Sequence, residues 1–528
     1  MTTTILITDP LAEEGLAILR KEKQLKVEVK AGLTPEQLKS AVGACEAWIV
    51  RSGTKVTKDL IQRADQLRVI GRAGIGLDNV DIDAATQRGV IVMNSPAGNI
   101  ISTAEHAMSL MLALARNIAQ ANASVRQGEW KRSKFTGVEL FGKVLGVVGL
   151  GRIGTEVVRR AQPFGMKAIA FDPHLTEDRA RSLEVRLVAL DELLKTADYI
   201  TFHTPLTDET RHMIGEREVK ILKKGVRLIN CARGGILDEA AVAQGIEQGI
   251  VGGVALDVFE EEPPKDCPLL KYDNVIATPH LGASTEEAQV NVSVDIALQV
   301  RDALLGRGVR NAVNFPCLDP EVYKRIEPYL RLAEKIGSFQ GQLSDGPIQQ
   351  VRITYAGEVA SYQTSPITIA LIKGLLTPTL GETVNYVNAS VIAKERGIRV
   401  VESKVEDIEH FTNAIKLEVE SEQQTSQIVG GLFARGEPRI VRINEFAVDA
   451  IPSGYMILTS NVDRPGMIGE IGMILGDHKI NIAGMTFGRE APGKRAIMLL
   501  NVDQAISPEI QKQIRKAKHV LGVRVIKL

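Results

Sequence analysis

The strongest constraint on this chain is the stretch of residues 141–173, in which two apolar runs flank a glycine-rich turn. The first run, residues 144–148, is typical of a strand that is buried on both faces. Residues 155–164 are predicted to form a helix, and the second run, residues 168–171, predicts another strand that ends on Asp172. A strand, a turn, a helix and a second strand in this order predict a βαβ unit.

Three glycines, Gly149, Gly151 and Gly154, lie in G-x-G-x-x-G spacing between the first strand and the helix. Glycines mark any tight strand-to-helix turn, but the flanking strands and the closing acid together indicate a dinucleotide site. The glycines allow the tight turn, the close approach of backbone N–H groups to a pyrophosphate, and the packing of the helix on the strand. The pyrophosphate would lie at the helix N-terminus, where unpaired N–H groups favour an anion.

Asp172 indicates which dinucleotide binds. Its carboxylate would accept hydrogen bonds from the adenosine ribose hydroxyls, and it would repel a 2′-phosphate. No arginine follows it, since the next residues are Pro173 and His174. We therefore predict NAD as the cofactor.

Size and composition indicate a protein of several globular domains. The 528 residues exceed what one hydrophobic core supports, so about two to four domains are expected. Lys plus Arg and Asp plus Glu both number 64, which gives no electrostatic reason to bind nucleic acid or a membrane surface. The N-terminus lacks the basic and apolar regions of a signal peptide, and the longest apolar helix, residues 107–115, is too short to span a bilayer.

The cysteines are scattered and form no C-x-x-C pair. Such spacing predicts neither a disulfide framework nor a metal site, and it is typical of a reducing compartment, so we expect a cytoplasmic protein. The four cysteines are Cys45, Cys231, Cys267 and Cys317.

Alternating strands and helices predict an α/β fold with two doubly wound parallel-sheet domains. Residues 99–282 contain the glycine fingerprint and would form a Rossmann-type cofactor domain. Residues 1–98 lack such a fingerprint and would form a flavodoxin-like substrate-binding domain. A long helix predicted over residues 286–305 would return the chain to that domain, which residues 283–314 would complete.

The C-terminal part of the chain has a different character. Residues 315–452 contain short β-rich segments at 349–355, 407–419, 427–432 and 439–443, with a helix near 365–376, and they predict an α+β intervening domain. Residues 453–528 follow the order β-α-β-β-α-β, which predicts a ferredoxin-like unit. Such a unit after an enzyme suggests a regulatory ligand domain, and a dimerisation module is the alternative.

Basic residues and glycines follow two strands of the first domain, as Arg51-Ser52-Gly53 and as Arg72-Ala73-Gly74. Ligands of open α/β sheets bind outside the carboxyl ends of the strands. These arginines would therefore form an anion site for a charged substrate, although a solvated rim is the alternative. The basic pair Lys131 and Arg132 could join this site from a neighbouring subunit or could belong to the surface.

Three charged residues, Arg233, Glu262 and His280, follow strands of the cofactor domain. His280 would take a hydroxyl proton as hydride leaves carbon, and Glu262 would fix the imidazole tautomer and raise its pKa. Arg233 would bind a carboxylate bidentately and polarise the neighbouring oxygen. Taken singly, such a histidine is more often structural and the glutamate could belong to an acidic turn, but the three together favour an alcohol-oxidising site.

These motifs resemble the D-isomer-specific 2-hydroxyacid dehydrogenases over essentially the whole chain. The resemblance rests on five segments, 71–81, 148–154, 230–235, 256–263 and 278–285. It implies catalytic roles for Arg233, Glu262 and His280. The implied cofactor contacts are Ile75, Gly149, Gly151, Arg152, Ile153, Gly154, Asp172, Thr204, Cys231, Ala232, Asp257, Gly282 and Ala283. The implied and predicted substrate contacts are Arg51, Ser52, Arg72, Gly74, Lys131 and Arg132.

The two C-terminal domains place the resemblance with the long form of this family, in which the last unit is an ACT domain. That form implies a homotetramer that oxidises 3-phospho-D-glycerate to 3-phosphohydroxypyruvate, the first step of L-serine biosynthesis. It also implies L-serine as an effector, bound through Asp463 and Asn481. The residues alone indicate only hydride transfer from an acidic substrate. The alternatives are a glyoxylate or hydroxypyruvate reductase, which lacks the two C-terminal domains, and a non-enzymatic NAD-sensing partner of transcription factors.

Overall fold

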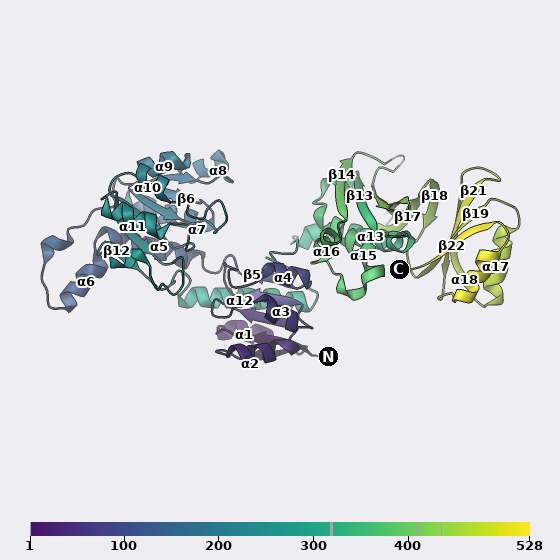
Figure 1. Cartoon of the computed structure of the whole chain (residues 1–528), viewed down its shortest axis with the longest axis horizontal. Helices are drawn as coiled ribbons and strands as arrows, with labels where there is room; N and C mark the ends of the chain where they lie inside the picture. Colours follow the sequence, from purple (N-terminus) through teal and green to yellow (C-terminus); the bar gives the residue numbers. More distant parts are fainter. Residues whose placement is uncertain (1, 317–319, 409–410, 434–435) are drawn as a thin grey trace.

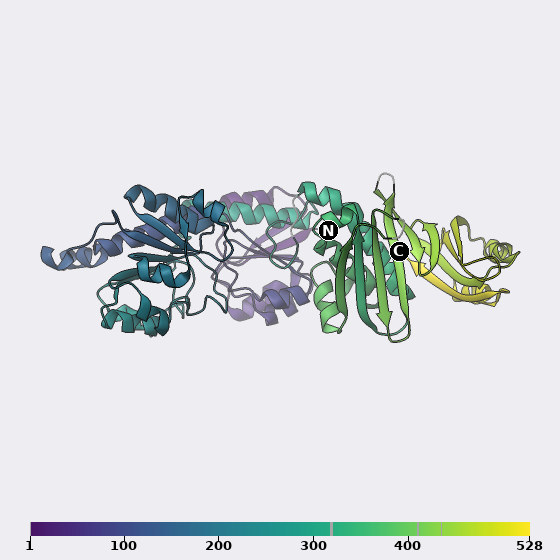
Figure 2. The same cartoon turned by 90° about the horizontal axis from the view of Figure 1, so that it is seen from above.

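The computed structural model describes residues 2–316, 320–408, 411–433 and 436–528. Four sheets form four lobes that follow one another along an elongated molecule (Figures 1 and 2). The lobe with the glycine-rich turn lies at one end, the N-terminal lobe lies next to it, and the C-terminal lobe lies at the other end. Within the described part of the chain, no helix is both long and apolar enough to cross a membrane.

The N-terminal lobe contains a five-stranded parallel sheet in the order β2-β1-β3-β4-β5. This order confirms the flavodoxin-like prediction. The last helix of the lobe comes from far along the chain and buries Val292, Ile296 and Val300 against the sheet. The strands are β1 (Thr3–Ile7), β2 (Leu25–Val29), β3 (Ala47–Val50), β4 (Val69–Arg72) and β5 (Ile91–Asn94). The helices are α1 (Glu13–Arg20), α2 (Pro35–Ala41), η1 (Val42–Ala44), α3 (Lys58–Arg63), α4 (Ile82–Gln87) and α12 (Glu286–Leu304).

The second lobe contains a seven-stranded parallel sheet in the order β12-β11-β10-β9-β6-β7-β8. The strand order reverses between β6 and β9, which is the point where doubly wound sheets bind dinucleotides. The strands are β6 (Val144–Val148), β7 (Lys167–Phe171), β8 (Arg186–Leu187), β9 (Tyr199–Phe202), β10 (Val226–Asn230), β11 (Val251–Leu256) and β12 (Val275–Ala277).

Helices cover both faces of this sheet, and one arm projects away from it. The arm contains α6 (Ile118–Arg126) and η2 (Arg132–Phe135), and it extends at the far end of the molecule (Figure 1). The helix after the glycine-rich turn begins at Arg152, earlier than predicted, because Gly151 is itself its N-cap. The covering helices are α5 (Ile100–Ala115), α7 (Arg152–Ala161), η3 (Gln162–Phe164), α8 (Glu177–Arg181), α9 (Leu190–Thr196), α10 (Glu216–Ile221), α11 (Glu239–Glu247) and η4 (Pro268–Lys271).

The third lobe contains a six-stranded sheet in the order β14-β13-β15-β16-β17-β18, parallel only between β13 and β14. Two long helices, α13 and α15, pack against each other and over this sheet. The strands are β13 (Ile348–Ala356), β14 (Arg399–Val405), β15 (Ala414–Ser421), β16 (Thr425–Phe433), β17 (Glu437–Ile443) and β18 (Phe446–Ala450). The helices are α13 (Pro320–Leu343), α14 (Glu358–Ser361), α15 (Ser365–Leu380), η5 (Gly381–Thr383) and α16 (Ala389–Glu395).

Several elements of this lobe differ from the sequence prediction. Helices α13 and α16 and strands β14 and β18 were not expected. The strand expected over residues 407–419 begins only at Ala414, and residues 409 and 410 lie outside the described residues, as does Cys317. Strand β14 has mostly exposed side chains because it is an edge strand, so its sequence lacks the apolar alternation of a half-buried strand.

The C-terminal lobe confirms the predicted ferredoxin-like unit. Its antiparallel sheet has the order β20-β21-β19-β22, and two helices pack on one face around Ile457, Ile471 and Ile514. The strands are β19 (Tyr455–Val462), β20 (Ile482–Arg489), β21 (Arg495–Val502) and β22 (Val520–Lys527), and the helices are α17 (Met467–Asp477) and α18 (Pro508–Lys516).

Candidate active site

The glycine-rich turn between β6 and α7 has the geometry that a dinucleotide requires. Gly149 has φ +89°, in the left-handed region that favours glycine. A Cβ on Gly154 would overlap the carbonyl oxygen of Gly149, so α7 packs this closely only with glycine there. A Cβ on Gly151, by contrast, would meet nothing within 4 Å. The N-terminus of α7 therefore opens onto free space that can receive an anion.

Polar groups around this turn fit the rest of a dinucleotide. The Oγ1 of Thr204, in the loop after β9, is buried and has no hydrogen-bond partner among the described residues. The Asp172 carboxylate ends β7, where its oxygens accept 2.9 Å hydrogen bonds from the N–H groups of Leu150 and His174. An unpaired buried hydroxyl and a carboxylate that flank a free helix N-terminus match the donors and acceptors of a ribose and a pyrophosphate.

The predicted histidine and glutamate form a direct pair. His280 Nδ1 lies 2.8 Å from Glu262 Oε2, and the imidazole is about half exposed. The hydrogen bond that His280 donates to Glu262 raises the pKa of His280, although burial opposes it. For Glu262, burial raises the pKa, but the hydrogen bond and charge of His280 outweigh it and hold the pKa below its usual value. Because Nδ1 faces the carboxylate, Nε2 is the ring nitrogen left for a substrate.

The predicted arginine spans the space between the first two lobes. Arg233 follows β10, yet its Nε forms a 3.0 Å ion pair with Asp78 Oδ2 of the N-terminal lobe. Its Nη1 also donates to the Ala232 carbonyl at 2.7 Å. A Cβ on Gly76 would overlap the Arg233 guanidinium, so the N-terminal lobe offers glycine where this side chain crosses. Arg233 therefore lies where the two lobes face each other.

Arg72 of the N-terminal lobe lies near two other arginines, Arg233 and Arg51. The Nε of Arg72 is buried and unpartnered among the described residues, and a Cβ on Gly74 would overlap its guanidinium. Burial lowers the pKa of Arg72 to about 10, and the positive charges of Arg233 and Arg51 contribute further to this shift. Nearby like charges with an unpaired donor favour the binding of an anion.

The remaining predicted cofactor residues follow strands of the first two lobes or lie at the start of α7. Arg152 Nη1 reaches the Pro96 carbonyl at 3.4 Å, and Ile75 accepts a 2.6 Å hydrogen bond from Asn94. Cys231 is buried, and burial raises the pKa of its thiol strongly. Ala232, Ile153, Gly282 and Ala283 are partly or largely covered and follow strands or open α7 at the same sheet edge.

Asp257, one of the predicted cofactor contacts, follows β11 and forms hydrogen bonds with protein groups. Its side chain is fully buried, and protein groups occupy both of its oxygens. Oδ1 accepts from the Thr278 hydroxyl at 2.6 Å and from the Leu281 N–H at 2.7 Å, and Oδ2 accepts from the Gly282 N–H at 2.8 Å. The carboxylate therefore holds the loop after β12, and its contact with the cofactor stays a prediction.

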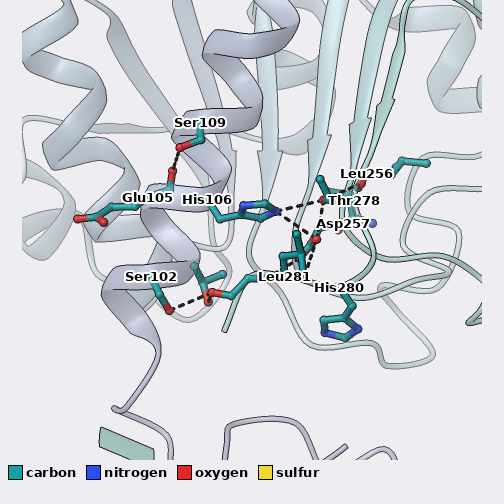
Figure 3. Close-up of polar contacts among 12 residues, drawn as sticks. Ser102, Glu105, His106, Ser109, Leu256, Asp257, Thr278, His280 and Leu281 are labelled. Atoms are coloured by element: carbon teal, nitrogen blue, oxygen red, sulfur yellow. Dashed lines mark hydrogen bonds and ion pairs between the residues drawn. The ribbon is translucent and has the colours of Figure 1, made fainter. Parts of the chain in front are cut away.

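A histidine that the sequence analysis missed completes this network. His106 Nε2, on α5, lies 3.1 Å from both Thr278 Oγ1 and Asp257 Oδ1 (Figure 3). Burial raises the pKa of Asp257, but the hydrogen bonds of His106, Thr278 and Leu281 outweigh it and bring the pKa below its usual value. The signal in the sequence was a histidine four residues after Ser102, on a helix whose buried side chains are otherwise mostly apolar.

Comparisons with known proteins identify three segments of the chain. Residues 108–282 match the model of the D-isomer specific 2-hydroxyacid dehydrogenase NAD binding domain, residues 325–444 that of the D-3-phosphoglycerate dehydrogenase intervening domain, and residues 455–519 that of the ACT domain. A D-3-phosphoglycerate dehydrogenase of Methanocaldococcus jannaschii is 47% identical over 525 residues, which cover 99% of both chains. The chain belongs to the D-isomer specific 2-hydroxyacid dehydrogenases.

Other relatives agree with this assignment. A D-3-phosphoglycerate dehydrogenase of Bacillus subtilis is 44% identical over 99% of both chains. The crystal structure of a D-lactate dehydrogenase from Aquifex aeolicus, in complex with NAD and lactic acid, is 29% identical with a TM-score of 0.54 and covers 59% of this chain and 100% of that one. The chain is therefore an NAD-dependent 2-hydroxyacid dehydrogenase, and the predicted family, enzyme class and cofactor are confirmed.

Two predicted substrate residues of this dehydrogenase lie apart from the others. Lys131 forms a 2.6 Å ion pair with Glu129, and the Arg132 guanidinium lies 5.5 Å from the ring centre of Trp130. All four residues belong to the arm that projects away from the sheet (Figure 1). Within one chain, Lys131 and Arg132 therefore do not join Arg51 and Arg72.

The two predicted effector residues of the ACT domain also lie apart. Asp463 accepts from Arg489 and from the Gly493 N–H, at the start of β21, whereas Asn481 donates to Asp503 at its end. Strand β21 has 8 residues, so roughly 25 Å separates the two positions at about 3.3 Å per residue. One small effector cannot contact both residues of a single chain. Among the described residues, no group of His, Cys, Asp and Glu could hold a metal ion.

Proposed function

We propose that this dehydrogenase oxidises 3-phospho-D-glycerate to 3-phosphohydroxypyruvate, the first step of L-serine biosynthesis. The observation that carries this proposal is the set of three arginines, Arg51, Arg72 and Arg233, next to the His280–Glu262 pair. A substrate with a carboxylate and a phosphate supplies two anions to such a set. The names of the full-length relatives support the same substrate.

The chemistry is the removal of a proton and a hydride from one carbinol. Bound NAD supplies the acceptor for the hydride that leaves C2 of the substrate. His280 Nε2 takes the proton of the C2 hydroxyl as the C2–O bond becomes a carbonyl, and it returns the proton in the reverse direction. Glu262 holds Nδ1 and stabilises the imidazolium that forms.

The arginines bind the two anionic groups of the substrate from different lobes. Arg233 binds the carboxylate and polarises the C2 oxygen, because it lies on the cofactor lobe and reaches into the interlobe space. Arg51 and Arg72, with Ser52 and the backbone at Gly74, hold the phosphate. Residues 1–98 with 283–314 thus bind the substrate, and residues 99–282 bind NAD.

Assembly of several copies would bring together predicted site residues that lie apart within one chain. The projecting arm exposes Ile118, Val125 and Trp130, which is unusual for the surface of a monomer. We propose a cytoplasmic homotetramer in which this arm packs on another copy and brings Lys131 and Arg132 to that copy's substrate site. Asp463 of one ACT domain and Asn481 of another would likewise form one L-serine site, which also accounts for their separation within a chain.

An assay of NADH formation with two substrates tests the proposed reaction. The kcat/KM for 3-phospho-D-glycerate should exceed that for unphosphorylated D-glycerate by roughly 100-fold or more, because a buried phosphate–arginine pair contributes several kcal/mol. Equal values for the two substrates would contradict the assignment.

The variant Arg51→Ala locates the phosphate site. It should raise the KM for 3-phospho-D-glycerate and leave the KM for NAD nearly unchanged. Arg63→Ala is a matched control, since Arg63 pairs with Asp59 on the surface of α3 in the same lobe. If Arg51→Ala raised both KM values in parallel, the side chain would serve the fold and not the substrate.

A further inference from the structure

We propose that His106 is a positioning residue for His280, which it holds in place through Asp257 and Thr278. The inference rests on the catalytic role of His280 in the proposed reaction. His106 itself points into the interior of the lobe, on the opposite side of the loop from the His280 ring (Figure 3). It therefore acts on the catalytic histidine through the loop and not by contact with the substrate.

Counting protons assigns the direction of each hydrogen bond. The single proton of the Thr278 hydroxyl goes to Asp257 Oδ1, the closest acceptor at 2.6 Å. The Thr278 oxygen can then only accept from His106, and an ionised Asp257 can also only accept. His106 Nε2 therefore carries the proton and shares it between Thr278 Oγ1 and Asp257 Oδ1, each 3.1 Å away.

This arrangement satisfies a fully buried carboxylate with four donors. They are the side chains of His106 and Thr278 and the backbone N–H groups of Leu281 and Gly282. Three of the four belong to the loop that carries His280, so Asp257 fixes that loop on both sides of the catalytic residue. A buried carboxylate that loses one donor has to recover it by moving or by admitting water.

Helix α5 holds the same loop at a second point. The hydroxyls of Ser102 and Thr103 both donate to the Gly282 carbonyl, at 2.9 and 3.1 Å. Ser102 and His106 are four residues apart and thus lie on one face of the helix. The helix therefore contacts the loop on both sides of His280, at Thr278 and at Gly282. Helix α5 has two titratable residues, Glu105 and His106. Glu105 is exposed, so His106 is the one that faces the loop.

A small displacement of this loop is costly for catalysis. A reacting group that moves by about 1 Å can lose on the order of 100-fold in rate, even when the change lies far from the chemistry. Binding of NAD depends mainly on the glycine-rich turn after β6, and less on the predicted contacts Gly282 and Ala283 of the held loop. Loss of His106 should therefore lower kcat far more than it weakens NAD binding.

Three substitutions of His106 test this proposal in the full-length enzyme. His106→Gln keeps an N–H donor at about the reach of Nε2, whereas His106→Asn carries its amide too short and His106→Leu has no donor. We expect kcat to fall by roughly 10- to 100-fold in the Leu and Asn variants. The Kd for NADH should change by less than about two-fold, and Gln should restore kcat to within about five-fold of the wild type.

A control variant on the same helix accompanies these substitutions, and two results would overturn the proposal. Ser109→Ala removes an exposed hydroxyl one turn along α5 that bonds only to Glu105, and it should leave kcat unchanged. Wild-type kcat in the Leu and Asn variants, or equal losses in Asn and Gln, would overturn the proposal. If the wild type itself formed no NADH with 3-phospho-D-glycerate, the proposed function would fail first, independently of His106.

Discussion

At the scale of single residues, the proposed mechanism makes the His280–Glu262 pair the determinant of the pH at which this dehydrogenase works. Glu262 raises the pKa of His280 through a 2.8 Å hydrogen bond and its negative charge. Oxidation requires the neutral imidazole, so kcat/KM falls as the pH falls through this pKa. Reduction requires the imidazolium, so its rate falls as the pH rises through the same value.

The variant Glu262→Gln should shift the pH profiles of oxidation and of reduction in the same direction. Without the carboxylate, the pKa of His280 decreases, so the acid limb of the oxidation profile and the alkaline limb of the reduction profile both shift to lower pH. The measurement is kcat/KM against pH in each direction. Glu261→Gln is the control, because Glu261 pairs with Lys265 at the surface. A profile of Glu262→Gln that overlays the wild type would show that the pair does not set the pKa.

Asp172 should decide the choice between NAD and NADP. Its Oδ2 accepts from the Leu150 N–H, so replacement by alanine would also disturb the glycine-rich turn. Asp172→Asn keeps an acceptor for this N–H and removes the charge that repels a 2′-phosphate. The ratio of kcat/KM for NAD over that for NADP should therefore fall by roughly 10-fold or more, because the repulsion between the carboxylate and the 2′-phosphate of NADP is lost. An unchanged ratio would refute this role.

At the scale of elements, the turn between β6 and α7 separates a folding requirement from a binding requirement. Gly151→Ala adds a Cβ into open space at ordinary backbone angles, so the free energy of unfolding should change by less than about 1 kcal/mol. The same Cβ occupies the space of the pyrophosphate, and NADH binding by fluorescence should weaken at least about 10-fold. Gly154→Ala should instead lose about 1–3 kcal/mol of stability through overlap with Gly149. Wild-type NADH affinity in Gly151→Ala would place the cofactor elsewhere.

Local patterns predicted the elements whose signals are local. The glycine-rich turn and the ferredoxin-like unit were found because residues within a few positions determine them. Helix α13 was missed because two prolines, Pro320 and Pro328, argue against a continuous helix. Pro320 lies in the first turn, however, where a proline costs no hydrogen bond. The helix continues through Pro328 while Leu332 and Ile336 bury against α15 and the sheet. Tertiary packing decided that element.

The same distinction applies to the site. Arg233, Glu262 and His280 follow strands of one sheet, so their position at its carboxyl edge could be predicted. His106 could not be recognised, because its partner Thr278 lies 172 positions further along the chain. The hydrogen bonds that hold Asp257 also come from residues 21 to 25 positions further along the chain, so its buried network could not be predicted from local patterns.

At the scale of the whole molecule, the proposed regulation and part of the proposed substrate site require assembly. Asp463 and Asn481 lie at opposite ends of β21, and Lys131 and Arg132 lie on a projecting arm. Sequence patterns on one chain could name these residues but could not place them, because the contacts that would join them lie between chains. A homotetramer of the 57.4 kDa chain should have a mass of about 230 kDa by light scattering.

Serine inhibition should require Asn481. Inhibition needs serine to favour one quaternary state by about 1–3 kcal/mol, a usual coupling energy. Asn481→Ala should abolish inhibition and leave uninhibited turnover nearly unchanged, because this residue lies in the lobe farthest from the active site (Figure 1). Gln513→Ala, which removes a surface partner of His478 in the same lobe, should remain inhibited. Calorimetry that detects no serine binding to the wild type would make the ACT domain an assembly module.

The most direct test of the account is the turnover of His280→Ala with 3-phospho-D-glycerate, measured together with its NADH affinity. General acid–base catalysis by a histidine is worth roughly two to four orders of magnitude, so kcat should fall by that amount while the Kd for NADH stays within about two-fold of the wild type. Near-normal turnover in His280→Ala would show that another group takes the proton and would contradict the proposed site.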